Sequence, residues 1–273
     1  MPALLALASA ATFGVADFLG GQATRRANVL AVTLFTNIAG LAVAVVLLAL
    51  VGGGWSTGSV GWGALGGLFG LGGLVLLYSG LAIGPNKVVS PLSAVVAAVV
   101  PVVAGIALGD RPDRWAILGL LITPVAVWLV AGGELGLDNA DRRPVFLAVG
   151  GGLGFGLFFT VLAQVPDGSG AVPLLAARAV SVTVLVIAVL VARPAFPRGR
   201  WRTMALTGGS LDMTANGLFL WSTRGGELAI VGALVSLYPA STVLLAVITL
   251  DERLSRSQGA GLALAIGAAA LLS

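Results

Sequence analysis

The sequence predicts an all-α integral membrane protein with ten transmembrane helices, arranged as two inverted five-helix repeats. The first reason is composition. Of 273 residues, 58% are hydrophobic and 10% are charged, and the mean hydropathy is +1.05, which is too much apolar surface for a soluble core. The second is the recurrence of apolar segments of about 20 residues, the length that crosses a bilayer as a helix. The third is an internal repeat at one fixed offset.

Ten apolar segments are predicted to span the membrane. They cover residues 3–20, 29–51, 61–83, 87–108, 114–131, 145–164, 172–192, 202–223, 227–249 and 257–272. The first lacks the basic start of a signal peptide and is followed by further spans, so we expect a retained helix. The longest connections, GGELGLDNADRRP and ARPAFPRGRWR, follow the fifth and seventh segments, and their Gly, Pro and Arg content suits short loops. No soluble domain is expected.

The internal repeat becomes visible when the chain is aligned with itself at an offset of 142 residues. Without a gap, Phe13-Gly14 then falls on Phe155-Gly156, and Asp110 falls on Glu252. We therefore expect a first repeat at residues 1–136 and a second at residues 137–273, together forming one transmembrane domain. Because five spans are an odd number, the second repeat enters the membrane from the opposite side, an architecture that many secondary transporters use and that channels also use.

The two halves share an ordered set of motifs: Phe13-Gly14, Gly84-Pro85, Pro91, Asp110-Arg111 and Gly119, then Phe155-Gly156, Gly226, Pro239, Glu252-Arg253 and Gly261. This set resembles the EamA-type transporters of the drug/metabolite transporter superfamily. The resemblance implies that spans 1–4 and 6–9 surround a central cavity, with spans 5 and 10 at the periphery. It also implies transport of small metabolites without ATP, often efflux of amino acids or related compounds. One departure is Ala97, which stands where the second half has Pro239.

Several kinds of chemistry are excluded by composition. Cysteine and histidine are absent, so a disulfide, a thiolate nucleophile, a Cys/His zinc site and a Ser–His dyad are impossible. We expect no enzyme activity and no cofactor, and the sequence has no phosphate-binding Gly-x-x-x-x-Gly-Lys-Ser/Thr loop. The net charge of +4 comes mostly from residues between apolar runs, which indicates membrane topology rather than nucleic-acid binding.

Asp212 and Arg178 are the most informative polar residues, because a charge near the bilayer centre is unfavourable by roughly 2.5–3.5 kcal/mol. They lie in adjacent antiparallel spans, at depths from the shared loop that differ by roughly 6 Å at about 1.5 Å per residue. We therefore predict an Arg178–Asp212 pair. Either it is a structural ion pair, or one partner contacts substrate or a coupling proton.

The other path candidates are polar or aromatic residues within spans. Asn216 follows Asp212 by one turn on the same face, and Asn37 lies in the second span. Asp17 either lines the cavity or is an interfacial acid near the first loop. Further candidates for the substrate or coupling path are Tyr238, Ser236 and Ser90, although hydroxyls in membrane helices commonly bond their own backbone.

Two prolines in equivalent spans, Pro91 and Pro239, are predicted to kink their helices and to serve as gates. The expected function is a secondary transporter of small amino-acid-like or drug-like metabolites, with a passive facilitator or a non-transporting sensor or assembly protein as alternatives. Expected partners are a small-molecule substrate, the lipid bilayer and protons as coupling ion, but not nucleic acid. The protein is expected to be a monomer or homodimer in the bacterial inner membrane.

Orientation is left open by two opposing indications. The loops after odd-numbered spans carry most of the Lys and Arg residues, such as Arg25 and Arg198, whereas the loops after even-numbered spans carry only Arg111, Arg114 and Arg224. The excess of positive charge in cytoplasmic loops would place both termini outside the cytoplasm. The family resemblance implies that both termini lie inside.

Overall fold

The computed structural model describes residues 1–83, 86–133, 142–250 and 254–273. Within these residues the chain forms helices joined by turns and short loops. In chain order the helices are α1 (Pro2–Thr24), α2 (Val29–Val51), α3 (Thr57–Ile83), α4 (Asn86–Leu108), α5 (Arg114–Val130), α6 (Arg143–Ala163), α7 (Val172–Ala192), α8 (Arg200–Thr223), α9 (Leu228–Val235), α10 (Tyr238–Leu250) and α11 (Arg256–Leu272).

Each predicted span corresponds to one helix, except the ninth, which is divided into α9 and α10. Among the described residues, seven segments are long and apolar enough to cross a membrane: α1, α2, α3, α4, α6, α7 and the segment that α9 and α10 form together. Helices α5 and α11 are apolar but have 17 residues each, and α8 carries Arg200, Arg202 and Asp212. By length and composition the helical membrane architecture is confirmed, while the count of ten spans stays a prediction.

Polar side chains at loop ends fix where several helices begin. Asn28 and Asp113 accept hydrogen bonds from the first free N–H groups of α2 and α5. Ser255 and Gln258 form a capping box at the start of α11. Such caps satisfy donors that have no partner within the helix, and each stabilises a helix by about 1 kcal/mol.

The break between α9 and α10 lies just before Pro239, which is the second residue of α10. Proline has no N–H and cannot donate to the carbonyl four residues earlier. The chain instead makes tighter turns here, in which the Leu237 N–H donates to the Leu234 carbonyl at 3.2 Å. By contrast, α4 continues through Pro91 and Pro101. The sequence predicts a kink at both Pro91 and Pro239. The structure has a helix break at Pro239, whereas the helix is continuous at Pro91.

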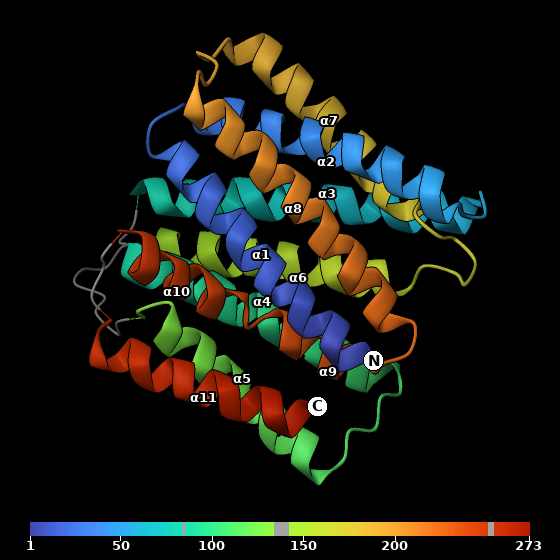
Figure 1. Cartoon of the computed structure of the whole chain (residues 1–273), viewed down its shortest axis with the longest axis vertical. Helices are drawn as coiled ribbons and strands as arrows, with labels where there is room; N and C mark the ends of the chain where they lie inside the picture. Colours follow the sequence, from blue (N-terminus) through green and yellow to red (C-terminus); the bar gives the residue numbers. More distant parts are fainter. Residues whose placement is uncertain (84–85, 134–141, 251–253) are drawn as a thin grey trace.

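Nine of the described helices, with α9 and α10 sharing one position, pack in a closed ring. The order around the ring is α8, α1, α9 with α10, α4, α6, α3, α7 and α2, which again contacts α8. Helices α5 and α11 pack on each other outside the ring, at the lower edge in Figure 1, whereas α2 and α7 form the opposite edge. This arrangement leaves one face of each ring helix directed at the ring interior.

The contacts follow a two-fold pattern between the halves. Helix α1 packs on α8 as α6 packs on α3, and α2 packs on α8 as α7 packs on α3. Pro2, in the first turn of α1, lies against Gly226 in the α8–α9 connection. The neighbouring Arg224 contacts Asp167 in the α6–α7 connection at 3.5 Å. Helix α1 therefore begins where α6 ends, at the end of the bundle called the N-terminal end below.

Glycine permits the closest helix contacts at equivalent places in the two halves. A Cβ atom added to Gly67 of α3 would collide with the Ala177 carbonyl of α7. A Cβ atom added to Gly209 of α8 would collide with the Thr36 carbonyl of α2. Gly67 and Gly209 are matched by the internal repeat, so the two halves use the same close approach, which is how small residues promote helix association in membranes.

Candidate functional site in the ring interior

Aromatic side chains identify the faces that point into the ring. Phe159 of α6 lies with its ring centroid 4.7 Å from that of Phe219 of α8 and 5.9 Å from that of Phe13 of α1. Phe158 and Tyr238 adjoin this group at 5.2 Å and 6.4 Å. Because α6 lies across the ring from α1 and α8 (Figure 1), these rings meet in the interior. We call the five residues the aromatic cluster.

A second group, the polar cluster, consists of Arg178 of α7, Asp212 and Asn216 of α8, and Asn37 of α2. The Arg178 guanidinium donates through Nη2 to Asp212 Oδ2 and through Nη1 to Asn37 Oδ1, the latter at 2.8 Å. Asn216 Nδ2 donates to Asp212 Oδ2 at 3.2 Å. The predicted Arg178–Asp212 contact is therefore present. Asn37 adds a hydrogen bond to Arg178, and Asn216 adds one to Asp212.

The polar cluster faces the same space as the aromatic cluster. Asp212, Asn216 and Phe219 are spaced at i, i+4 and i+7 along α8, which places them on one face of the helix. Phe219 contacts the α6 side of the ring, so this face is the interior one. Asp212 thus lies on the interior face near the middle of α8, where a charge is costly unless it is paired or accessible to water.

Charge balance explains why the pair is tolerated. Arg178 and Asp212 neutralise each other, and their side chains are 16% and 32% exposed. Asn37 is buried and its amide is oriented by an Nδ2 hydrogen bond to the Thr33 carbonyl at 2.8 Å. Asn216 is buried too, and its Oδ1 has no hydrogen-bond partner. The cluster is therefore a neutral, largely hydrogen-bonded unit with one unsatisfied acceptor.

Gly40 is a residue of this site that sequence reasoning missed. A Cβ atom placed on Gly40 would lie 3.1 Å from Arg178 Nε and 3.5 Å from its Cδ. Any side chain here would press on the guanidinium, so glycine makes room for the arginine. The available signal was the spacing of three residues from Asn37, which places both on one face of α2.

Asp17 lies on α1, one turn beyond Phe13 and on the same face. The position of Asp17 along the bundle follows from Gly208 of α8, which lies close to the carbonyl of Ala16, the residue before Asp17. Asp17 therefore lies about one helical turn from Asp212, toward the end of the bundle opposite the N-terminal end, which we call the far end. Asp17 is exposed.

The remaining candidates do not join either cluster in the described part of the chain. Ser236 is buried, and its hydroxyl donates to the Ala233 carbonyl at 2.7 Å, so it is bound to its own helix. Ser90 is exposed on α4. Pro91 and Pro239 are buried. Both prolines therefore lie in the packed interior of the bundle rather than on its surface.

Asp110, which follows α4, forms a hydrogen bond that joins the two halves. Asp110 Oδ2 accepts a hydrogen bond from the Ala229 N–H in the first turn of α9 at 2.8 Å. Nearby, Glu227 accepts from the Arg111 N–H at 3.1 Å. Helix N-terminal N–H groups attract carboxylates in this way. The matching residues Glu252 and Arg253 lie outside the described residues.

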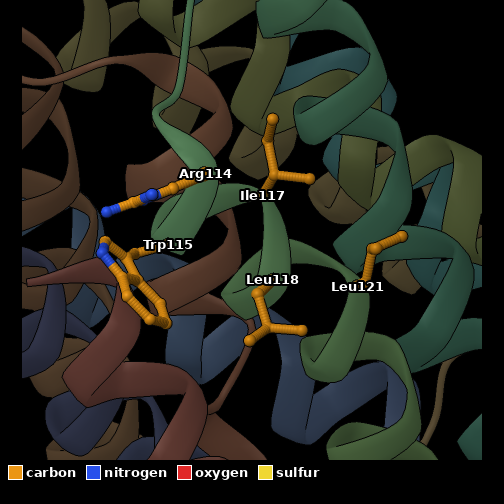
Figure 2. Close-up of a pocket in the computed structure, with 5 residues that line it drawn as sticks. All are labelled: Arg114, Trp115, Ile117, Leu118 and Leu121. Atoms are coloured by element: carbon orange, nitrogen blue, oxygen red, sulfur yellow. The ribbon is translucent and has the colours of Figure 1, made fainter.

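A shallow pocket of about 430 Å³ lies on the outer helix α5 (Figure 2). Its lining consists of Arg114, Trp115, Ile117, Leu118 and Leu121. The Arg114 guanidinium lies 5.3 Å from the Trp115 ring centroid, a pairing common at membrane interfaces. Because α5 is outside the ring, this pocket is separate from the polar cluster. Among the described residues, no group of His, Cys, Asp and Glu could hold a metal ion.

Apolar helices long enough to cross a membrane, packed in a ring with a charged pair inside, are typical of polytopic membrane proteins. The chain belongs to the EamA-like transporter family, whose sequence pattern matches residues 1–132 and again residues 142–273. This confirms the resemblance seen in the sequence. The protein is thus an integral membrane protein in a family of small-molecule transporters.

Comparison with solved structures supports the fold. One crystal structure, described only as that of a protein, superimposes with a TM-score of 0.80 and 19% sequence identity. The match covers 99% of this chain and 97% of the other. At this identity the likeness concerns the fold alone. A search of curated proteins gives no match.

Proposed function

We propose that the protein is a secondary transporter that moves small amino-acid-like or drug-like metabolites through the ring interior without ATP. The observation that carries the proposal is the Arg178–Asp212 pair with Asn37 and Asn216 on the interior faces of three helices. Charged residues inside membrane helices are rare, and they commonly mark substrate or ion pathways. Export is the proposed direction, across the bacterial inner membrane.

The proposed topology has ten spans in two inverted repeats, residues 1–136 and 137–273. It is supported by the two-fold contact pattern and by the opposite directions in which α1 and α6 enter the bundle. In this topology α8 is a full span, and its charged residues are accommodated at the helix start and at the interior pair. Alternating access then follows from movement of one repeat against the other around the polar cluster.

The N-terminal end of the ring is the proposed closed side in this conformation. There the Gly54 N–H donates to the Gly168 carbonyl at 2.8 Å, joining the two halves. Two further hydrogen bonds described above join the α4–α5 connection to this region: Asp110 accepts from α9, and Glu227 of the α8–α9 connection accepts from Arg111. Opening this end requires that these bonds break. The α9–α10 break before Pro239 is the proposed hinge, and Pro91, six residues before the equivalent position 97, is the proposed gate residue of α4.

Within this path we assign Asp212 the role of proton-coupling or substrate-contacting acid, and Arg178 the role of its partner. Asn37 and Asn216 hold the pair in place. Asp17 and Tyr238 line the path toward the far end, with Ser236 and Ser90 as further lining positions. The protein is proposed to work as a monomer or homodimer.

The test is uptake into proteoliposomes of a pooled amino-acid and metabolite panel, with and without an imposed pH gradient. The wild type is compared with Asp212→Asn, and with Asp167→Asn as a control because Asp167 lies in an exposed loop. Gradient-driven accumulation that Asp212→Asn abolishes and Asp167→Asn keeps supports the proposal. Downhill flux that ignores both the gradient and the Asp212 change indicates a facilitator. Absence of any flux from a folded protein refutes transport.

A further inference from the structure

We propose that the substrate carries a cationic N–H group that binds the Asp17 carboxylate, with an apolar or aromatic portion against Phe13 and Tyr238. This inference rests on the proposed function and names the substrate class of the same path. It depends on three observations: the charge balance of the ring interior, the environment of Asp17, and the unsatisfied acceptor on Asn216.

The first observation is a charge count. Away from the first and last turns of the described helices, the charged side chains are Asp17, Arg178 and Asp212. Arg178 and Asp212 cancel each other in the polar cluster. Asp17 has no hydrogen bond or ion pair in the described part of the chain. The interior therefore has one uncompensated negative charge when all three groups are ionised.

An uncompensated carboxylate in a membrane protein is unfavourable unless water or a ligand satisfies it. Asp17 is exposed, so it is open to either. A cationic ligand would restore neutrality and supply the missing donor. An anionic ligand would double the negative charge at this level of the ring, and Arg178, the cation of the polar cluster, is already bound to Asp212 and Asn37.

The second observation is the set of aromatic side chains beside Asp17. Phe13 lies one turn away on the same face of α1, and Tyr238 of α10 is 6.4 Å from Phe13 between ring centroids. The Thr242 hydroxyl donates to the Gly14 carbonyl at 3.1 Å, which holds α10 against α1 at this level. Aromatic faces next to a carboxylate attract ammonium groups through the ring quadrupole and exclude water from them.

The third observation is the buried Oδ1 of Asn216, which has no hydrogen-bond partner. It is an acceptor on α8, about two helical turns from the level of Asp17. Buried acceptors without a partner are rare and call for an explanation. A further N–H donor on the ligand, about 12 Å from its cationic group, can satisfy the Asn216 acceptor, whereas an ionised carboxylate has no donor and cannot.

The test uses three ligands with the same phenyl group and different charge: phenethylamine, phenylalanine and 3-phenylpropionate, which are a cation, a zwitterion and an anion. Binding of labelled phenethylamine to the purified full-length protein in detergent is measured, with the other two as competitors. We expect phenethylamine to bind at least about tenfold more tightly than 3-phenylpropionate, because a charge-assisted hydrogen bond is gained with one and repulsion with the other.

Variants locate the site. Asp17→Asn is expected to weaken phenethylamine binding at least about tenfold, while Asp17→Glu retains most of it and Asp167→Asn leaves it unchanged. Tyr238→Phe retains binding and Tyr238→Leu weakens it about threefold, because the ring face is lost. If Asp17→Asn does not fold, the ligand series on the wild type still decides the charge class.

Two outcomes overturn the inference. One is binding that does not distinguish phenethylamine from 3-phenylpropionate. The other is cation binding that a folded Asp17→Asn variant keeps in full. Proteoliposome flux separates these from failure of the proposed function: if phenylalanine or 3-phenylpropionate is transported and phenethylamine is not, the protein is a transporter and only the cation assignment is wrong. If none of the panel is transported, the proposed function fails.

Discussion

The interaction between Arg178 and Asp212 can be measured with a double-mutant cycle. The substitutions are Arg178→Gln and Asp212→Asn, alone and together, because each removes one charge with little change in size. Each single change leaves the other ion without its partner in the ring interior. Breaking a fully buried pair costs about 3–5 kcal/mol. The Arg178 side chain is 16% exposed and that of Asp212 is 32% exposed, so water compensates part of this loss.

We therefore expect each single change to lower the free energy of unfolding by about 2–3 kcal/mol. The double change restores neutrality, and its effect should be smaller than the sum of the two by about 1.5–3 kcal/mol. The assay is reversible unfolding in mixed micelles, followed by circular dichroism.

The matched control is the Arg224–Asp167 pair, whose N–O distance is 3.5 Å and whose Asp167 side chain is fully exposed. Exposed pairs contribute about 0–1 kcal/mol, so the same cycle at this pair should give a coupling energy near zero. Additive effects of Arg178→Gln and Asp212→Asn, within the error of the control cycle, would refute the assigned interaction.

Three further predictions follow from the packing of the helices. Gly209→Ala should lower the free energy of unfolding by about 1–3 kcal/mol because its Cβ meets the backbone of α2. Gly21→Ala is the control and should not lower it, because a Cβ atom there meets open space. Equal unfolding midpoints for the two variants would contradict this prediction. Pro239→Ala should slow transport several-fold in a folded protein, since it permits the helix to continue through the hinge, and a wild-type rate would remove Pro239 from the gate. Asp110→Asn should cost about 1 kcal/mol through the weakened hydrogen bond to α9, and an unchanged free energy of unfolding would show that this contact is not stabilising.

The sequence was sufficient for those features that depend on local composition and spacing. Apolar length located the helices, and the repeat offset paired the halves. The depths of Arg178 and Asp212 along adjacent antiparallel segments predicted their contact, because helix rise converts residue number into distance. Caps such as Asp113 are local as well, since they involve the next three residues.

Features that depend on the register between distant helices were beyond reach of the sequence. That Asn37 completes the polar cluster depends on how α2 slides against α7 and α8, and the role of Gly40 depends on the same contact. Pro91 and Pro239 have the same residue type in equivalent helices, yet only the second breaks its helix. Neighbouring packing decides whether a proline bends a helix or ends it, and a single sequence does not contain that information.

Cysteine accessibility tests the central claim, that the ring interior is a path open to water on one side at a time. The chain has no cysteine, so a single Cys at position 17 can be labelled without other changes. Asp17→Cys should react with a membrane-impermeant thiol reagent from one side of the membrane only. Leu121→Cys, on the outer face of α5 and 68% exposed, should not react because lipid covers it. If the cysteine at position 17 is as unreactive as that at position 121 from both sides, the interior is not an aqueous path and the account is wrong.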